Sequence, residues 1–406
     1  MIAPFSMARL PRIEFGAGRI SRLPALAAGF GRRLLLVTGA RSFTESAAWT
    51  TLQQGLEQAG LEWQLVRISG EPSPQRVDDI VGEWRHQAID LVVGIGGGSV
   101  LDAAKAVSGL LRIGDSVMDY LEGVGPEKPY RGPAVPFIAV PTTAGTGSEA
   151  TRNAVLSVAG RDGFKKSFRD ERLVPAYALV DPELLAGCPP ALIAADGMDA
   201  LTQLLESYVS SRANAMTDAL ALSGLEAARD SLLPWYQQRG DLVAARASMA
   251  YAALLSGITL AQTGLGSVHG LASPLGAFFP IPHGVVCGTL VGTATRVNID
   301  AMRTREPDNP ALDKYARVAS LLCRRHFEHR EQAWEALPDL LDDWTAQLQL
   351  PTLDAFGVGA TDFDHIVAHA RGSSMKTNPI VLTDGEIREI LARRCMPAHS
   401  KGGNII

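Results

Sequence analysis

The sequence predicts two domains, an α/β domain with a parallel sheet followed by an all-helical domain. From about Arg33 to Val140, short apolar runs alternate with amphipathic stretches, which is the pattern of βαβ units. From Ala191 onward, alanine- and leucine-rich helical runs replace the strand signals. Cys188-Pro-Pro190 separates the two patterns. We therefore expect domains at residues 1–188 and 189–406, a number that fits the length of 406 residues.

The composition excludes several classes of protein. The net charge is −5 without a long run of one sign, so neither a nucleic-acid groove nor binding to an anionic membrane is expected. We see no signal peptide in Met1–Leu10 and no window as long and apolar as a membrane span. The four cysteines are far apart and form no CxxC pair, which indicates a reducing compartment. A cytoplasmic protein is the prediction.

In the first domain, four apolar runs of strand length are bounded by Gly, Pro or Ser. Two stretches between them have helical spacing, and Ser73-Pro74 supplies the second with an N-cap and a proline at the first helical position. The expected strands are Leu34–Val37, Trp63–Ile68, Leu91–Ile95 and Phe137–Val140, and the expected helices are Thr44–Gln58 and Val77–Arg85. Residues 153–180 are less regular, and the adjacent lysines 165 and 166 are typical of a solvated edge, although Lys165 is also able to face a cofactor.

Two loops follow strands of this sheet, and parallel sheets bind ligands at the carboxyl ends of their strands. The first loop, Gly94-Ile-Gly-Gly-Gly-Ser99, precedes a helix expected at Val100–Val107. Its glycines allow close approach of an anion to the helix N-terminus, which predicts a phosphate site. The alternative is a plain tight turn, since Ser99 takes the third glycine position of the usual dinucleotide fingerprint.

The second loop is Pro141-Thr-Thr-Ala-Gly-Thr-Gly-Ser-Glu149. Its hydroxyl groups are suited to hydrogen bonds with ribose or phosphate oxygens. A solvated loop is the alternative.

In the second domain, six runs have helical spacing and length. They are Ala191–Ser210, Asn214–Leu233, Leu242–Gln262, Leu312–Arg325, Gln332–Leu348 and Asp384–Arg394. Ser400–Asn404 has the composition of a mobile terminus.

Two histidines, His269 and His283, flank a segment with three prolines. We expect a helix end at His269, a bent apolar loop, and a helix start after Pro282, so that both imidazoles converge. In the first expected helix, Asp199 and Gln203 are four residues apart and share one face. A carboxylate with two imidazoles is a common catalytic metal set. The alternative is that each histidine bonds to its own backbone neighbourhood.

These motifs, in this order, resemble the iron-containing (group III) alcohol dehydrogenases. The resemblance runs from Glu14-Phe-Gly-Ala-Gly18 through GGGS, PTTAGTGSE, Asp199 and the two histidines to Met375-Lys-Thr-Asn-Pro379. It implies a dinucleotide-binding domain, a helical metal-binding domain, catalysis between them, and a homodimer or larger homo-oligomer. The implied metal and catalytic residues are Asp199, His269 and His283, with Gln203 as a possible weak ligand. The implied cofactor-binding residues are Gly39, Arg41, Gly96, Gly97, Gly98, Ser99, Asp102, Thr142, Thr143, Thr146, Ser148, Lys165 and Leu179.

Two positions depart from the family pattern. Gln203 and Ser273 stand where the family usually has one histidine ligand and often has a further histidine. An amide oxygen is a poorer donor than imidazole to Fe(II) or Zn(II), so Gln203 weakens the case for either metal. Similar glycerol dehydrogenases manage with an aspartate and two histidines. Similar maleylacetate reductases, which are regarded as metal-independent, are the alternative.

The expected activity is hydride transfer between NAD(P) and a small alcohol, aldehyde or ketone, with Fe²⁺ or Zn²⁺ as the metal. Gly39 stands where NAD-preferring relatives have an aspartate, and Arg41 is positioned to pair with a 2′-phosphate. We therefore favour NADP over NAD, the alternative being that Arg41 points to solvent. A lyase or cyclase of the dehydroquinate synthase kind, which has a similar fold, and a non-catalytic nucleotide-binding protein are the competing functions.

Overall fold

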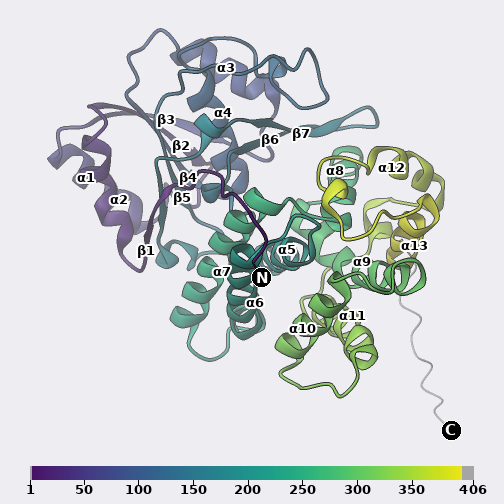
Figure 1. Ribbon diagram of the computed structural model, residues 1–406. Coiled ribbons are helices and arrows are strands. Elements are labelled where there is room, and N and C mark those ends of the chain that lie inside the picture. Colours follow the sequence, from purple (N-terminus) through teal and green to yellow (C-terminus); the bar gives the residue numbers. More distant parts are fainter. Residues whose placement is uncertain (1, 396–406) are drawn as a thin grey trace.

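The computed structural model describes residues 2–395, which form an α/β domain and a helical domain side by side (Figure 1). The first is built on a six-stranded sheet of order β1-β8-β5-β4-β2-β3, in which every neighbouring pair is parallel. Its strands are β1 (Arg12–Phe15), β2 (Arg33–Gly39), β3 (Glu62–Ile68), β4 (Leu91–Gly96), β5 (Phe137–Pro141) and β8 (Tyr177–Val180). The predicted parallel sheet is confirmed, as are its four predicted strands.

Helices cover both faces of the sheet because its central strands are apolar on both sides. Alternate residues of β2 show this, since Leu34 and Leu36 pack with one pair of helices and Leu35 and Val37 with the other. The first pair is α1 (Leu23–Ala28) and α2 (Ala47–Gln58), and the second is α3 (Pro74–Trp84) and α4 (Gly98–Leu110). Ser73 caps α3 as predicted, because its side chain accepts from the Arg76 amide at 3.2 Å.

A two-stranded antiparallel hairpin, β6 (Asn153–Val158) and β7 (Phe164–Arg169), extends from this domain toward the helical one (Figure 1). The sequence did not predict it, because its strands are short and mostly half-buried and its turn lacks a two-residue signal. Hydrogen bonds join the hairpin to the helical domain, among them one between His365 Nε2 and the Arg161 carbonyl at 3.3 Å. The Gly160 amide donates to the Ala277 carbonyl at 3.0 Å, and Ser273 Oγ donates to the Lys165 carbonyl at 2.9 Å.

The rest of the described chain, residues 181–395, contains helices and no strand, as predicted. The long helices share one hydrophobic core. They are α5 (Pro190–Val209), α6 (Ala215–Tyr236), α7 (Leu242–Thr263), α8 (Ser267–Phe278), α9 (His283–Arg305), α10 (Ala311–Cys323), α11 (Arg330–Gln347) and α13 (Asp384–Cys395), with the short α12 (Phe363–His369). The expected boundary at residues 188/189 lies between β8 and α5 and stays a prediction.

The prediction that no segment is long and apolar enough to span a membrane was wrong for α7. By length and composition this helix meets the criterion, but 61% of its most apolar stretch is buried inside the structure, where it packs against α5 and α6. A core helix of this kind has the same composition as a membrane span, since both are surrounded by apolar groups.

The prediction of a helix end at His269 was also wrong. Helix α8 begins at Ser267 and continues through Pro274, so the bend comes only at residues 279–282. Pro274 removes one backbone hydrogen bond, but the buried side chains of Val268, Leu271 and Leu275 hold the helix against the core. The predicted helix start after Pro282 is confirmed by α9.

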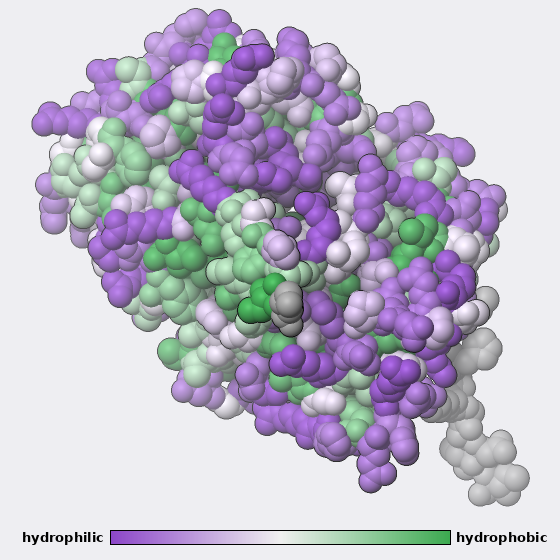
Figure 2. All heavy atoms as spheres, in the orientation of Figure 1, coloured by the Kyte–Doolittle hydropathy of each residue, from purple (hydrophilic) through white to green (hydrophobic). Residues whose placement is uncertain are grey.

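One face of the molecule is mostly hydrophilic, with a hydrophobic area beside the N-terminal segment (Figure 2). Ile2 and Phe5 in that segment are 72% and 44% exposed. The segment is tied to α7, because the Ala8 amide donates to Gln262 Oε1 at 2.6 Å. The predicted mobile terminus, Ser400–Asn404, lies outside the described residues.

Candidate metal centre and cofactor cleft

Four potential metal ligands converge in the helical domain. Asp199 comes from α5, His269 from the first turn of α8, and His283 and Cys287 from the first turns of α9. Their ligand atoms all lie within 4.8 Å of one another. Asp199 Oδ1 is 3.1 Å from His269 Nε2 and 3.8 Å from His283 Nε2. The three metal residues expected from the sequence are thus brought together, and Cys287 joins them.

Glu206 fixes the orientation of the His269 ring. It lies seven residues after Asp199, two turns along the same face of α5. Its Oε2 accepts from His269 Nδ1 at 2.7 Å and its Oε1 accepts from the Val268 amide at 2.7 Å. Nε2 is therefore directed at Asp199, in the carboxylate–histidine arrangement that supports metal-bound imidazoles.

Sequence reasoning did not assign a role to Glu206 or Cys287. The available signals were spacings, seven residues from Asp199 for Glu206 and four residues from His283 for Cys287. Either spacing is common in a buried helix, so only the packing of α5, α8 and α9 reveals the cluster.

In the cluster of potential ligands, one carboxylate is shared by two histidines. Burial raises the pKa of Asp199, but His283 and the bond with His269 outweigh it and lower that pKa to about 2. Burial lowers the pKa of His269, yet Cys287 and Asp199 raise it well above the usual value. Burial lowers the pKa of His283 to about 4. His283 is therefore a neutral imidazole at pH 7, the form that binds a metal.

The donor set fits a divalent transition metal. A carboxylate oxygen, two imidazole nitrogens and a thiol sulfur are all ligands that zinc and related ions accept. The Asp199 side chain is 1% exposed, so its charge needs a buried cationic partner. Nδ1 of His283 is buried and has no hydrogen-bond partner among the described residues, in contrast to Nδ1 of His269.

The two residues that depart from the family pattern have other partners. Gln203 is buried, and its Oε1 accepts from Ser256 Oγ of α7 at 2.9 Å. The Ser273 hydroxyl donates to the carbonyl of Lys165, across the domain boundary. Both residues still line the cleft described below.

The two glycine- and hydroxyl-rich loops pack against each other at the carboxyl edge of the sheet. Gly97 is the N-cap of α4, so the backbone N–H groups of the first turn, which have no partner within the helix, lie at this edge of the sheet. A Cβ atom on Gly97 would lie 3.3 Å from Thr143, and one on Gly98 would lie 2.7 Å from Thr146 Oγ1. The Thr142 amide donates to the Gly96 carbonyl at 3.0 Å. Such a helix N-terminus lined with hydroxyls is suited to a phosphate.

Asp102, Lys105 and Ser148 tie these loops together. Ser148 Oγ donates to Asp102 Oδ1 at 2.5 Å. Lys105, fully buried, donates through Nζ to the carbonyl and hydroxyl of Ser148 at 2.8 and 3.0 Å, and also to Thr151 and Asn153. Burial lowers the Lys105 pKa to about 8 despite Asp102 and Glu149. This network gives Asp102 and Ser148 a structural task in addition to any contact with a cofactor.

The remaining cofactor candidates are spread more widely. Gly39 ends β2, and a Cβ there would be 3.9 Å from Val100 of α4. Arg41 is exposed and makes no ion pair with any residue in 2–395. Lys165 is not a solvated edge residue, because its side chain is only 10% exposed and pairs with Glu71 at 2.5 Å. Leu179 lies in β8 within the sheet core and is 0% exposed.

A cleft of about 680 Å³ connects the loops with the cluster of potential metal ligands. Six cofactor candidates and both histidines line it, together with Gln203 and Ser273. The six are Gly98, Ser99, Asp102, Thr146, Ser148 and Lys165. The glycine-rich loop suited to a phosphate and the two histidines suited to a metal therefore line the same cleft.

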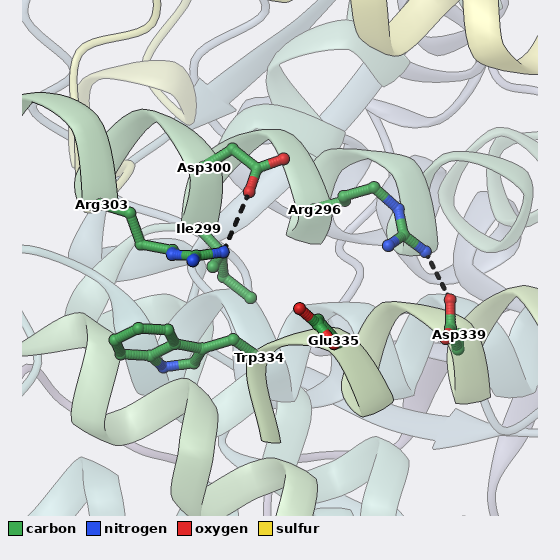
Figure 3. A pocket seen from close by; sticks show the side chains of 7 residues that line it. All are labelled: Arg296, Ile299, Asp300, Arg303, Trp334, Glu335 and Asp339. Atoms are coloured by element: carbon green, nitrogen blue, oxygen red, sulfur yellow. Dashed lines mark hydrogen bonds and ion pairs between the residues drawn. The ribbon is translucent and has the colours of Figure 1, made fainter. Parts of the chain in front are cut away.

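A second hollow of about 420 Å³ lies between α9 and α11 (Figure 3). Its arginines are already paired, Arg296 with Asp339 at 2.8 Å and Arg303 with Asp300 at 3.8 Å. None of the cofactor or metal candidates lines this hollow. It carries no feature that points to catalysis.

Comparison with known proteins agrees with this geometry. Residues 11–182 match the family model described as iron-containing alcohol dehydrogenase, and residues 193–395 match the C-terminal model of the Fe-containing alcohol dehydrogenase family. Alcohol dehydrogenase 4 of Saccharomyces cerevisiae is 33% identical over 346 residues, covering 84% of this chain and 86% of the relative. The NAD-dependent methanol dehydrogenase of Bacillus methanolicus is 33% identical over 315 residues, covering 77% and 78%.

Among solved structures, a 1,3-propanediol oxidoreductase superposes with a TM-score of 0.86 at 28% identity, covering 97% of this chain and 100% of the other. Both halves of the chain therefore match, in sequence and in fold, one group of enzymes. The chain is an oxidoreductase that belongs to the iron-containing alcohol dehydrogenase family.

Proposed function

We propose that this chain catalyses reversible hydride transfer between C4 of a nicotinamide cofactor and the carbonyl carbon of a small aldehyde or ketone. The observation that carries the proposal is the shared cleft, lined by the α4 N-terminal loop on one wall and by His269 and His283 on the other. Cofactor and substrate would bind side by side there, and proximity alone lowers the barrier by several kcal/mol.

In this proposal Asp199, His269 and His283 hold a divalent metal, Fe²⁺ or Zn²⁺. When bound, the metal supplies a Lewis acid for the carbonyl oxygen of the substrate. Glu206 keeps the His269 ring in place. Burial of Asp199 keeps water from competing for its carboxylate.

The cofactor would lie across the Gly96–Ser99 and Thr142–Gly147 loops, with its phosphates at the N-terminus of α4. We propose NADP as the preferred form. Gly39 offers no carboxylate to repel a 2′-phosphate, and the exposed, unpaired Arg41 lies two residues further along. The related methanol dehydrogenase is named for NAD, so the preference needs its own test.

The proton for the alkoxide would come from water or from a ribose hydroxyl. Ser273 stands where the family often has a histidine, but its hydroxyl is committed to the Lys165 carbonyl. A hydroxyl is also a much weaker acid than imidazole near pH 7.

We further propose a cytoplasmic homo-oligomer, a homodimer or larger, acting on small molecules. The four cysteines are free, which suits a reducing compartment. Ile2 and Phe5 are exposed apolar side chains that a second subunit would cover.

A second candidate is a metal-independent reductase of an anionic carbonyl compound, as in maleylacetate reductases. The cations of the cleft favour it, because Arg212 and Lys376 line the cleft and make no ion pair with another described residue. Unpaired cations of this kind bind carboxylates on substrates.

The deciding experiment measures metal content and activity on the same sample. The proposed function predicts near-stoichiometric metal and NADPH oxidation with small aldehydes that a chelator abolishes and the metal restores. Metal-free protein with undiminished, chelator-insensitive activity would instead support the second candidate. The absence of NAD(P)H turnover with any aldehyde or ketone would contradict both.

A further inference from the structure

Cys287 packs in the hydrophobic core of the helical domain and also belongs to the cluster of potential metal ligands. It lies one helical turn after His283 on α9 and is 0% exposed. Its Sγ is 3.5 Å from His269 Nε2 and 3.8 Å from His283 Nε2. A buried thiol that only fills space would be surrounded by apolar groups, whereas this one faces a carboxylate and two imidazoles.

The spacing of the four atoms is that of a tetrahedral site. Zinc bonds of about 2.0–2.1 Å to N and O place two such ligands roughly 3.3 Å apart, and a zinc–sulfur bond of about 2.3 Å places S and N roughly 3.6 Å apart. The observed N–O distances are 3.1 and 3.8 Å, and the S–N distances are 3.5 and 3.8 Å. Small rotations of side chains would bring all four atoms onto one ion.

Gln203 is less suited to the fourth position. Its oxygen already accepts from Ser256 Oγ at 2.9 Å, and this bond directs the amide toward α7. A neutral amide is also a weaker ligand for transition metals than a thiolate.

We propose that the Cys287 thiolate is the fourth protein ligand of the metal, in place of Gln203, and that the site selects zinc over iron. The inference rests on the metal site of the proposed function and specifies its donor set as carboxylate, two imidazoles and thiolate. Thiolate donors favour zinc more than carboxylate and imidazole donors do.

The test is X-ray absorption at the zinc edge on the intact zinc-loaded protein. We expect one sulfur neighbour at about 2.3 Å in the wild type and none in Cys287→Ser. Cys323→Ser is the matched control, because Cys323 ends α10 and takes no part in the cluster, and it should keep the sulfur neighbour. In cobalt-loaded protein, Cys323→Ser should keep the thiolate-to-cobalt charge-transfer band and Cys287→Ser should lose it.

A metal competition completes the experiment. Zinc exceeds iron in affinity at most N, O and S sites, so the informative quantity is the change in that ratio. With Fe(II) and Zn(II) offered in equal amounts without oxygen, the ratio of zinc to iron bound should fall at least about tenfold from wild type to Cys287→Ser. Wild type whose bound zinc has only N and O neighbours would overturn the inference. If that protein still reduces aldehydes in a chelator-sensitive way, the proposed function stands. Protein that binds no metal at all overturns both.

Discussion

Glu206 orients one histidine of the candidate metal centre without belonging to the proposed ligand set. It accepts from His269 and from the Val268 amide, so it fixes both the ring and the first turn of α8. We expect Glu206→Gln to keep the bond to Val268 through its amide oxygen but to weaken the hold on His269. Metal affinity should fall by roughly 10- to 100-fold, as for other residues that orient a ligand.

This expectation is checked by competition with a metal-binding dye. The control is Glu226→Gln, because Glu226 lies on α6 with its side chain 58% exposed and should leave metal affinity unchanged. Unchanged affinity in Glu206→Gln would mean that packing alone orients His269.

Glu149 makes the stability of the fold depend on pH. It is 3% exposed, and burial raises its pKa from 4.5 to about 7. Between pH 4.5 and 7 the folded chain therefore holds a proton on Glu149 that the unfolded chain releases, so this group lowers stability as the pH rises through that window. We expect Glu149→Gln to gain roughly 3 kcal/mol over wild type between pH 4.5 and 8.

Unfolding of wild type and variant by urea at several pH values measures this difference. The sign matters most, since the advantage of Glu149→Gln must grow with pH. A constant difference from pH 4.5 to 8 would show that Glu149 titrates alike in both states.

Arg41 tests the cofactor preference. If it pairs with a 2′-phosphate, Arg41→Ala should lower kcat/KM for NADPH by about 10-fold or more and leave NADH unchanged, because a hydrogen bond between charged groups is worth about 1.5–3 kcal/mol. Arg33→Ala is a suitable control, since Arg33 begins the same strand at the opposite edge of the sheet. Equal efficiency with both cofactors, unaffected by Arg41→Ala, would contradict the NADP preference.

At the scale of elements, the second cofactor loop depends on its contact with α7. Gly147 has φ 61°, and a Cβ there would lie 2.4 Å from the Gly257 amide nitrogen. The backbone of the loop and the helix therefore touch directly. We expect Gly147→Ala to destabilise the protein by roughly 2–5 kcal/mol, because it adds left-handed strain and overpacking, and to weaken cofactor binding as the loop shifts.

The control is Gly82→Ala on α3, where a Cβ meets nothing within 4 Å. It should be neutral or stabilising by up to about 1 kcal/mol. Thermal unfolding and cofactor titration of both variants decide the point. A Gly147→Ala protein as stable as Gly82→Ala would mean that loop and helix separate without cost.

Helices and strands with a clear hydrophobic periodicity were predictable from the sequence. Those that depend on contacts with distant parts of the chain were not. Helix α5 was predicted to within a residue at each end, and β4 with its glycine loop was recognised from an apolar run followed by Gly96, Gly97 and Gly98. The β6–β7 hairpin was missed because it is held by bonds to Ala277 and Ser273 of the other domain. The residues of the hairpin alone do not indicate that such distant partners exist, because strand formation depends strongly on tertiary contacts.

The same division holds for the candidate site. Asp199, His269 and His283 were predicted because buried charge on an apolar helix and histidines in a proline-rich segment are unusual locally. Cys287 was not, because a lone cysteine in an apolar helix has the composition of core. Only the packing of α9 against α5 and α8 turns Cys287 toward the metal cluster.

At the scale of the whole molecule, the cleft joins two units that are stabilised differently. The sheet has apolar layers on both faces, whereas the hydrophobic core shared by α5, α8 and α9 also contains the buried ionisable side chains of the cluster. A metal bound to Asp199, His269 and His283 would link these three helices. Removing it should therefore loosen the helices and leave the sheet unchanged.

We expect chelation to lower the unfolding midpoint. For metal present at 100 times its dissociation constant, the free energy of unfolding should fall by about 2.7 kcal/mol when the metal is removed. Hydrogen exchange should accelerate in α5, α8 and α9 and stay constant in β2 and β4. Addition of cofactor gives a contrasting pattern, because it should protect residues 96–99 and 142–147 instead. If chelation changes exchange equally in sheet and helices, the metal does not link these helices specifically, and if it changes neither, the cluster holds no metal.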